Sequence, residues 1–265
     1  MNRRTFLKGF ALTAAGLWVP KAHARLGTMM MGGGVTAAPA SGHSKSDANL
    51  MALWYFENNL NDSSGGGNNT LTGVATPAYV DTDVKQGTYK LSLTDATNNY
   101  AYITDANQVG LECTGNNWSF GGFFYMTANV YTIMMNKHGD GDYGWKISFN
   151  YTGPLLSFNY STNGSDWNSV DSAVGSFNLN TWYHYVLTYD HTTLRLYTDG
   201  SESTTGDFPL TATFNINDTA KDFGIGYNDL NGQIATGYWD ECFVFNDTLS
   251  GAEVLEIYNS GFGDR

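Results

Sequence analysis

The chain has 265 residues, a size that suits one large β domain preceded by a leader. Its formal net charge is −12. The first 24 residues contain no acid and four bases, Arg3, Arg4, Lys8 and Lys21, so the remainder carries a net charge of −16. Such an acidic surface repels phosphate backbones and anionic lipid, and we therefore expect no nucleic acid among the partners.

The N-terminus has the features of an export signal in their usual order. Residues 3–8 (RRTFLK) form a twin-arginine box, residues 9–20 are mostly apolar, and residues 22–24 (AHA) fit an A-x-A cleavage site. The apolar run is shorter than the roughly 20 residues that cross a bilayer, so we predict no transmembrane segment in the mature chain. We predict a twin-arginine signal peptide over 1–24 and a periplasmic, extracellular or cell-surface location. The alternative is a basic, apolar N-terminus without a signal role.

A flexible linker is expected over 25–47, because this segment is rich in Gly, Ala, Ser and Met and has no periodicity. The folded domain is then expected over 48–263. Aromatic residues make up 15% of the chain, and Asn, Thr, Ser and Tyr are frequent from Asp47 onward. This mixture favours strands and polar turns over helices.

Period-two alternation predicts most of the strands. Trp118, Phe120 and Phe124 share one parity, and residues 182–190 alternate in the same way before a turn at 199–200 (DG). About a dozen such strands at this spacing imply a two-sheet sandwich. One helix is expected near the C-terminus, with Ser250 and Glu253 as a capping box and Gly261 at its end.

Several segments together resemble a known family. The most diagnostic is 182–200, with WYHYV, YD and LRLYTDG in order; 53–57 (LWYFE), 62–65 (DSSG) and 237–241 (GYWDE) are similar to the family's other motifs. The chain resembles the LamG-like jelly rolls of the concanavalin A-like lectin/glucanase superfamily. The resemblance implies an all-β, two-sheet antiparallel jelly-roll sandwich with one short C-terminal helix.

The sequence argues against an enzyme. Glycosidases of this architecture carry an E-x-D-x-x-E strand, which this sequence lacks, and G-x-S-x-G is absent too. Asp240 and Glu241 are adjacent and are expected to point to opposite faces of their strand. A carboxylate pair from separate loops, such as Asp140 with Asp166, leaves open a glycoside hydrolase without the usual motif.

The resemblance also implies a structural calcium ion. In this fold class a calcium often sits on the convex sheet, and the likeness places its carboxylates at Glu57 and Asp240, with backbone carbonyls completing the shell. The alternative makes Asp62 a turn cap, Asp240 a hydrogen-bonding strand residue and Glu57 a solvated side chain.

Ligand binding is expected to use aromatic side chains near polar turns. Trp167 lies in such a turn beside Asp166, and Tyr143 and Trp145 follow the loop at 139–142. Aromatic faces stack on sugar rings while neighbouring polar groups orient them, so these four residues are the candidate glycan site. The alternative is ordinary hairpin packing. Four other tryptophans are predicted to be core residues: Trp54, Trp118, Trp182 and Trp239.

The two cysteines, Cys113 and Cys242, allow two interpretations. Their strands are expected to neighbour each other and an oxidising compartment permits a disulfide, whereas the alternative is two free buried thiols. His184 is expected to be a packed structural residue.

We therefore predict an exported, non-catalytic recognition module for carbohydrate or cell-surface glycans, stabilised by calcium. The second hypothesis is a structural or decoration protein that uses the jelly roll as a scaffold, and the third is a glycoside hydrolase without the usual motif.

Overall fold

The computed structural model describes residues 43–128, 130–150, 153–228 and 233–263. The predicted signal peptide lies outside these residues, and so does the linker except for its last five. Those five residues belong to the folded domain, because β1 (His43–Ser44) pairs in parallel with β20 (Phe262–Gly263). The predicted boundary at 48 is therefore too late. No helix in the described part of the chain is long and apolar enough to cross a membrane.

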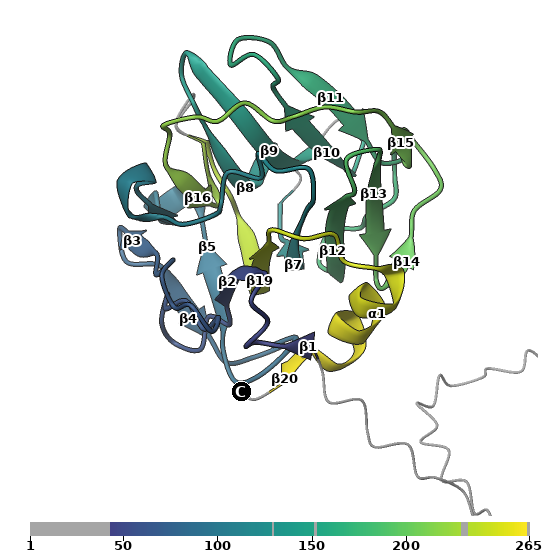
Figure 1. Ribbon diagram of the computed structural model, residues 1–265. Helices are drawn as coiled ribbons and strands as arrows, with labels where there is room; N and C mark the ends of the chain where they lie inside the picture. The colour runs from purple at the N-terminus through teal and green to yellow at the C-terminus, as the bar shows by residue number, and fades with distance from the viewer. Residues whose placement is uncertain (1–42, 129, 151–152, 229–232, 264–265) are drawn as a thin grey trace, which may run out of the picture. The chain divides into compact units, whose positions relative to one another are not determined.

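Two antiparallel sheets lie face to face (Figure 1). Among the described residues, the first sheet has seven strands. In spatial order they are β11 (Asn168–Asp171), β10 (Leu155–Tyr160), β9 (Asp142–Asn150), β8 (Thr132–Gly139), β16 (Phe223–Ile225), β6 (Tyr100–Ile103) and β3 (Thr72–Val74). The predicted all-β jelly-roll sandwich is confirmed.

The second sheet has nine strands within the same described ranges. Its main path is β14 (Ser201–Glu202), β13 (Thr193–Thr198), β12 (Trp182–Tyr189), β7 (Trp118–Met126), β19 (Gly237–Phe245), β5 (Lys90–Leu93) and β4 (Ala78–Val80). β15 (Leu210–Thr211) pairs with β13, and β2 (Leu50–Trp54) pairs with β19. The remaining elements are β17 (Tyr227–Asn228), β18 (Gln233–Ile234) and the 3₁₀ turns Asp95–Thr97 and Asp105–Asn107.

The main core fills the space between the sheets and is rich in aromatic rings. Phe120 of the nine-stranded sheet stacks on Trp145 of the seven-stranded sheet, with ring centroids 4.4 Å apart. Phe223 of the seven-stranded sheet likewise stacks on Trp54 of the other, at 5.3 Å. Each ring of this kind buries a large apolar area and so stabilises the contact between the sheets. Trp54, Trp118 and Trp239 are fully buried, as predicted.

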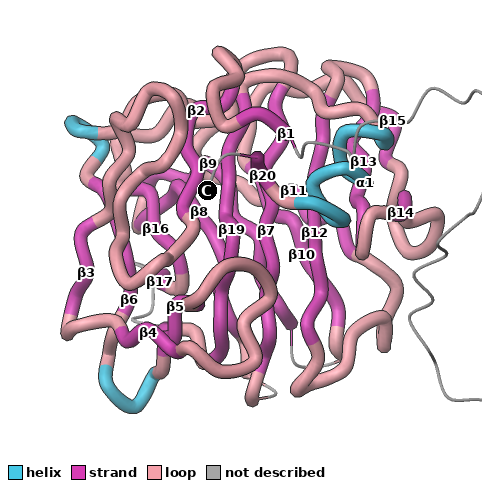
Figure 2. Tube along the Cα trace, turned by 90° about the horizontal axis from the view of Figure 1, so that it is seen from below, coloured by secondary structure: helices cyan, strands magenta, loops and turns pink. Residues whose placement is uncertain are grey.

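A second, smaller core lies on the outer side of the nine-stranded sheet. The single predicted helix, α1 (Gly251–Ser260), packs there beside β1 and β14 (Figure 2). It buries Val254 and Ile257 against Val186 of β12 and Phe243 of β19. The predicted capping box forms, since the Ser250 side chain accepts the Glu253 N–H and the Glu253 carboxylate accepts the Ser250 N–H. The helix ends at Gly261, as expected.

A β-bulge in β19 changes the predicted direction of one carboxylate. The pairing between β19 and β7 shifts between Asp240 and Phe243, and Glu241 takes a φ of 47°. The extra residue turns Glu241 to the outer side, where its carboxylate lies against Gly261. Asp240 also faces outward, toward the 81–89 loop. The expectation that these two acids point to opposite faces is therefore wrong.

Trp182 is not a core residue, which corrects a second expectation. It is half-buried on the outer face of the nine-stranded sheet, in ring contact with Tyr125 at 5.5 Å. The Lys90 ammonium lies 5.4 Å from its ring centre, and its indole N–H donates to the Asp83 carbonyl. Alternation along β12 fixes two faces, but the face that enters the main core carries Tyr185, Leu187 and Tyr189 instead.

Two tryptophan truncations test this placement. We expect Trp118→Ala to lower the free energy of unfolding by about 3–5 kcal/mol, because it empties a fully buried site. Trp182→Ala should cost about 1–2 kcal/mol, because part of its ring already faces water. Urea unfolding of the two variants measures both. Equal losses would contradict the surface position of Trp182.

Candidate functional site

The outer face of the seven-stranded sheet carries a row of polar and aromatic side chains. On β6, alternation sends Ala101 and Ile103 into the core and leaves Tyr100 and Tyr102 half-buried on the other side. Strand pairing places Tyr102 opposite Gly224 of β16, and Gly224 opposite Asn136 of β8. A side chain at Gly224 would lie against Asn136 and Tyr227, so the glycine leaves space in the middle of the row.

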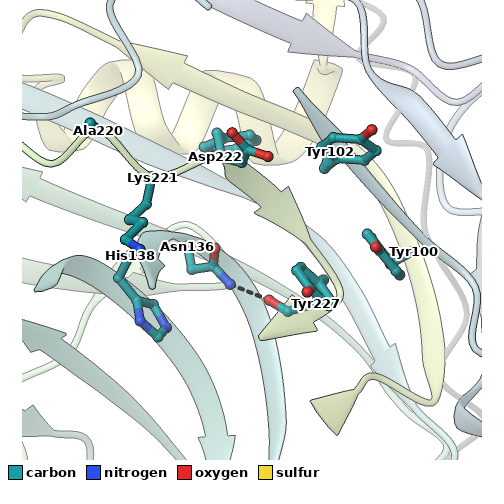
Figure 3. Close-up of a pocket in the computed structure, with 9 residues that line it drawn as sticks. Tyr100, Tyr102, Asn136, His138, Ala220, Lys221, Asp222 and Tyr227 are labelled. Carbon is teal, nitrogen blue, oxygen red and sulfur yellow. Dashed lines mark hydrogen bonds between the residues drawn. The ribbon is translucent and has the colours of Figure 1, made fainter. Parts of the chain in front are cut away.

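A pocket of about 330 Å³ opens over this row (Figure 3). Its aromatic side is formed by Tyr100 and Tyr227, whose rings stack with centroids 3.9 Å apart and planes 10° apart. The Asn136 amide donates a hydrogen bond to the Tyr227 carbonyl and fixes the position of this pair. The described residues that line it are Tyr100, Tyr102, Asn136, His138, Ala220, Lys221, Asp222, Phe223 and Tyr227.

One wall of the pocket is held from below by a buried lysine. Lys137, on β8, is fully buried, and its ammonium donates to the carbonyls of Thr219 and Lys221 at 2.9 and 2.8 Å. The same ammonium forms an ion pair with Asp105 at 2.6 Å. Three partners compensate the loss of hydration of a buried ammonium. These bonds anchor the backbone on either side of Ala220, next to the pocket-lining residues Lys221 and Asp222.

The predicted residues Tyr143 and Trp167 come together next to this pocket. Their rings stack at 4.7 Å with planes 12° apart, and the Lys146 ammonium lies 4.6 Å from the Trp167 ring. Trp167 also meets His138 edge to face at 5.2 Å. Since His138 lines the pocket, it joins the two aromatic groups. Trp167 is half-buried by these contacts, not the freestanding ring that a polar turn suggested.

Two other predicted ligand residues do not reach this surface in the same way. Trp145 is fully buried in the main core, and its indole N–H donates to the Leu111 carbonyl, so the expectation that it stacks on a ligand is wrong. Its neighbour Lys146 takes the outward position because side chains alternate along β9. Asp166 is exposed and accepts a hydrogen bond from the Asn163 amide within the turn that carries Trp167. A ligand contact by Asp166 stays a prediction.

His138 and His184 are buried imidazoles whose nitrogens lack hydrogen-bond partners in the described part of the chain. Burial lowers the pKa of each ring to about 3, with the nearby ammonium groups of Lys146 and Lys85, respectively, acting in the same direction. Both rings are therefore neutral at pH 7. His184 packs against Phe123 under α1, in agreement with a structural role.

These two pKa values predict an acid-sensitive fold. An unfolded histidine has a pKa near 6.5, so the unfolded chain binds more protons than the folded one as the pH falls from about 6.5 toward 3. The stability due to neutral burial is complete above that window and is lost within it. Between pH 7 and pH 5, protonation of each histidine in the unfolded chain should lower the free energy of unfolding by about 2 kcal/mol.

Urea unfolding at pH 7 and pH 5 measures this loss. In His184→Phe the loss should be smaller than in the wild type by about 2 kcal/mol, because one of the two groups is gone. The difference between the proteins isolates the histidine from the carboxylates that titrate in the same range. An identical pH dependence would contradict the neutral, buried state of His184.

Glu57 and Asp240, the predicted calcium ligands, both hold the 81–89 loop. The Glu57 carboxylate accepts the N–H groups of Thr88 and Tyr89, and Asp240 accepts those of Lys85 and Gln86. Among the described residues, no group of three or more His, Cys, Asp and Glu side chains is arranged to hold a metal ion. The carboxylates face amide hydrogens, whose partial positive charge repels a cation.

The alternative role proposed for Asp62, that of a turn cap, is observed. Asp62 caps its turn by accepting the N–H groups of Leu53, Ser64 and Asn69. Calcium binding by Glu57 and Asp240 stays a prediction, and one that the observed hydrogen bonds disfavour.

Metal removal decides between loop anchoring and calcium. If the carboxylates only anchor the loop, a chelator leaves the melting temperature unchanged. Asp240→Asn then lowers the free energy of unfolding by about 1–2 kcal/mol, because hydrogen bonds to a charged acceptor are about twice as strong as neutral ones. A melting temperature that falls with chelator in the wild type, and not in Asp240→Asn, would instead establish the calcium site.

Cys113 and Cys242 are both buried and free, so the disulfide interpretation is not what the structure shows. Burial raises the pKa of each thiol well above its ordinary value, and the carboxylates of Asp240 and Glu241 add to this for Cys242. Burial and the raised pKa both disfavour the nucleophilic thiolate form of these residues.

Sequence reasoning missed most of the pocket. Tyr100 and Tyr102 carried a usable signal, since two tyrosines alternate with Ala and Ile over 100–103. His138 and Tyr227 carried none, because only strand pairing and a turn bring them to Tyr100.

A family model described as the Concanavalin A-like lectin/glucanases superfamily matches residues 95–255. The match covers more than half of the chain and includes β6, β8 and β16, which form the floor of the pocket. The chain belongs to this superfamily. No curated protein matches the chain in sequence.

Several solved structures share the fold. Domain 4 of AbnA, a GH43 extracellular arabinanase from Geobacillus stearothermophilus, was solved with arabinotriose; it is 20% identical, with 79% of this chain and 98% of that chain covered and a TM-score of 0.58. The botulinum neurotoxin type G receptor binding domain is 18% identical, with 80% of this chain covered and a TM-score of 0.58. This chain spans 51% of that domain. Likeness at these identities shows the fold.

Proposed function

We propose that this domain is a non-catalytic module that binds a glycan across the outer face of the seven-stranded sheet. The observation that carries the proposal is the open pocket of about 330 Å³ between the Tyr100–Tyr227 stack and the Trp167 cluster. Aromatic faces bury the apolar faces of sugar rings, while Asn136, Lys221 and Asp222 offer donors and acceptors to hydroxyl groups. Such a combination is typical of small-ligand sites.

Proteins of the same fold support this chemistry. The AbnA domain was solved in complex with arabinotriose. A botulinum neurotoxin type C structure, 13% identical with a TM-score of 0.60, is described by the dependence of cell entry on interaction with two ganglioside molecules. Both ligands are carbohydrates or carry them. We transfer the ligand class to this domain on the strength of its own pocket.

The carboxylates near the pocket favour binding over hydrolysis. Glycoside hydrolysis generally uses two carboxyl groups across the scissile bond. Among the described residues, Asp222 is the one carboxylate in the lining, and Asp105, whose N–H donates to it, is paired with the buried Lys137. We therefore propose that the site binds its ligand without cleaving it. Export to the periplasm or cell surface, where glycans are met, belongs to the same proposal and depends on the predicted leader.

Glycan binding by the full chain is the test. We expect one or more of arabinotriose, xylotriose and cellotriose to bind in isothermal titration calorimetry, and Tyr100→Ala to weaken that binding about tenfold through loss of one stacking ring. Tyr238→Ala is the matched control, because this half-buried tyrosine lies on the outer face of the opposite sheet. It should bind like the wild type.

Two results would overturn the proposal. Absence of binding to these trioses and to a broad glycan array would favour the scaffold hypothesis. Release of shorter sugars from polysaccharide by the wild type, but not by Asp222→Asn, would favour the hydrolase.

A further inference from the structure

The position of His138 is unexplained by packing alone. The side chain is 1% exposed, its ring lines the pocket, and neither ring nitrogen has a hydrogen-bond partner among the described residues. Buried polar groups in folded proteins nearly always have partners, and one without a partner is destabilising. An apolar ring would fill the same volume without that cost. The arrangement becomes favourable if a partner arrives with the ligand.

The location of His138 says which part of a ligand it would meet. It sits between the Tyr100–Tyr227 stack and Trp167, which it contacts at 5.2 Å. A sugar chain that stacks on one aromatic group and extends toward the other must pass over this imidazole. Both nitrogens are shielded from solvent before binding, so a side-chain rotation of Trp167 or of His138 must accompany the contact. Rotamer changes of this kind are common on binding.

We propose that His138 is the specificity-determining residue of the site, and that it selects a neutral oligosaccharide of at least two rings by hydrogen bonding to a hydroxyl group. The proposal rests on the glycan-binding function above and narrows its ligand class. A neutral imidazole has one donor and one acceptor, and a hydroxyl group can serve either. A carboxylate can only accept, so an acidic sugar whose carboxylate meets the imidazole leaves the acceptor nitrogen unsatisfied and has to lose the hydration of its charge as well.

The chain supplies a matched control in His184. It is as buried as His138 and its nitrogens also lack partners in the described ranges, but it lies under α1 on the opposite sheet. Replacement of either histidine by phenylalanine removes two unpartnered nitrogens and keeps an aromatic ring. Both variants should therefore melt at or above the wild-type temperature. Binding should separate them.

The experiment is calorimetry of the full chain with arabinotriose, xylotriose, cellotriose, their monosaccharides and trigalacturonate. We expect the bound neutral triose to lose about tenfold to a hundredfold in affinity in His138→Phe and nothing in His184→Phe. His138→Gln, which retains a donor and an acceptor, should lose less and guards against a folding defect in the phenylalanine variant. In wild-type protein the triose should shift the imidazole ¹⁵N resonances of His138 and leave those of His184 unchanged.

The outcomes separate the two proposals. If His138→Phe binds the triose like the wild type, or if the His138 resonances do not move, this inference is wrong and glycan binding stands. Equal affinity for trigalacturonate, or for the monosaccharide, would overturn the neutral, multi-ring ligand class. If the wild type binds no saccharide at all, the proposed function itself fails.

Discussion

Contact between aromatic rings across the two sheets is the constraint on which the rest of the structure depends. Phe120 on Trp145 and Trp54 on Phe223 each join one sheet to the other. Once Trp145 is fixed inside, alternation along β9 turns Lys146 outward, and strand pairing brings Asn136 of β8 beside it. The composition of the outer face is thus set by what the inner face must bury. The residues that can contact other molecules are those that the core does not bury.

Local sequence patterns were sufficient to predict the architecture, but they were insufficient to predict which face of a sheet each side chain occupies. The capping box at Ser250 and the strands around Trp118 depend on neighbours in sequence, and their prediction was confirmed. The side of the sheet on which Trp182 lies depends on α1 and the 81–89 loop, because both faces of β12 are partly covered and alternation cannot tell them apart. The prediction for Trp145 was wrong for the same reason: it was expected at the surface and lies in the core. The bulge that turns Glu241 outward has no signature in the sequence.

The candidate site could be predicted only in part. Tyr143 and Trp167 were found because they flank polar turns, and these turns do meet. His138 was not predicted. Its ring nitrogens have no hydrogen-bond partner among the described residues, and the strand sequence Asn-Lys-His gives no information about such partners. The ammonium of its neighbour Lys137 donates hydrogen bonds to the carbonyls of Thr219 and Lys221. Two adjacent polar residues of one strand thus serve opposite faces, one as a support and one in the pocket.

The pairing of β1 with β20 bears on how several copies of this domain could bind one polymer. Phe262 of β20 belongs to the small core on the outer side of the nine-stranded sheet, and His43 of β1 pairs with it and contacts Phe245 of the same core. The first and last described strands therefore lie side by side, against the sheet opposite the one that carries the pocket. Copies arrayed on a surface through that side would all turn the pocket outward. If the domain binds a glycan as proposed, the affinity for one sugar segment would then combine into avidity for a repetitive polymer, with no new contact needed.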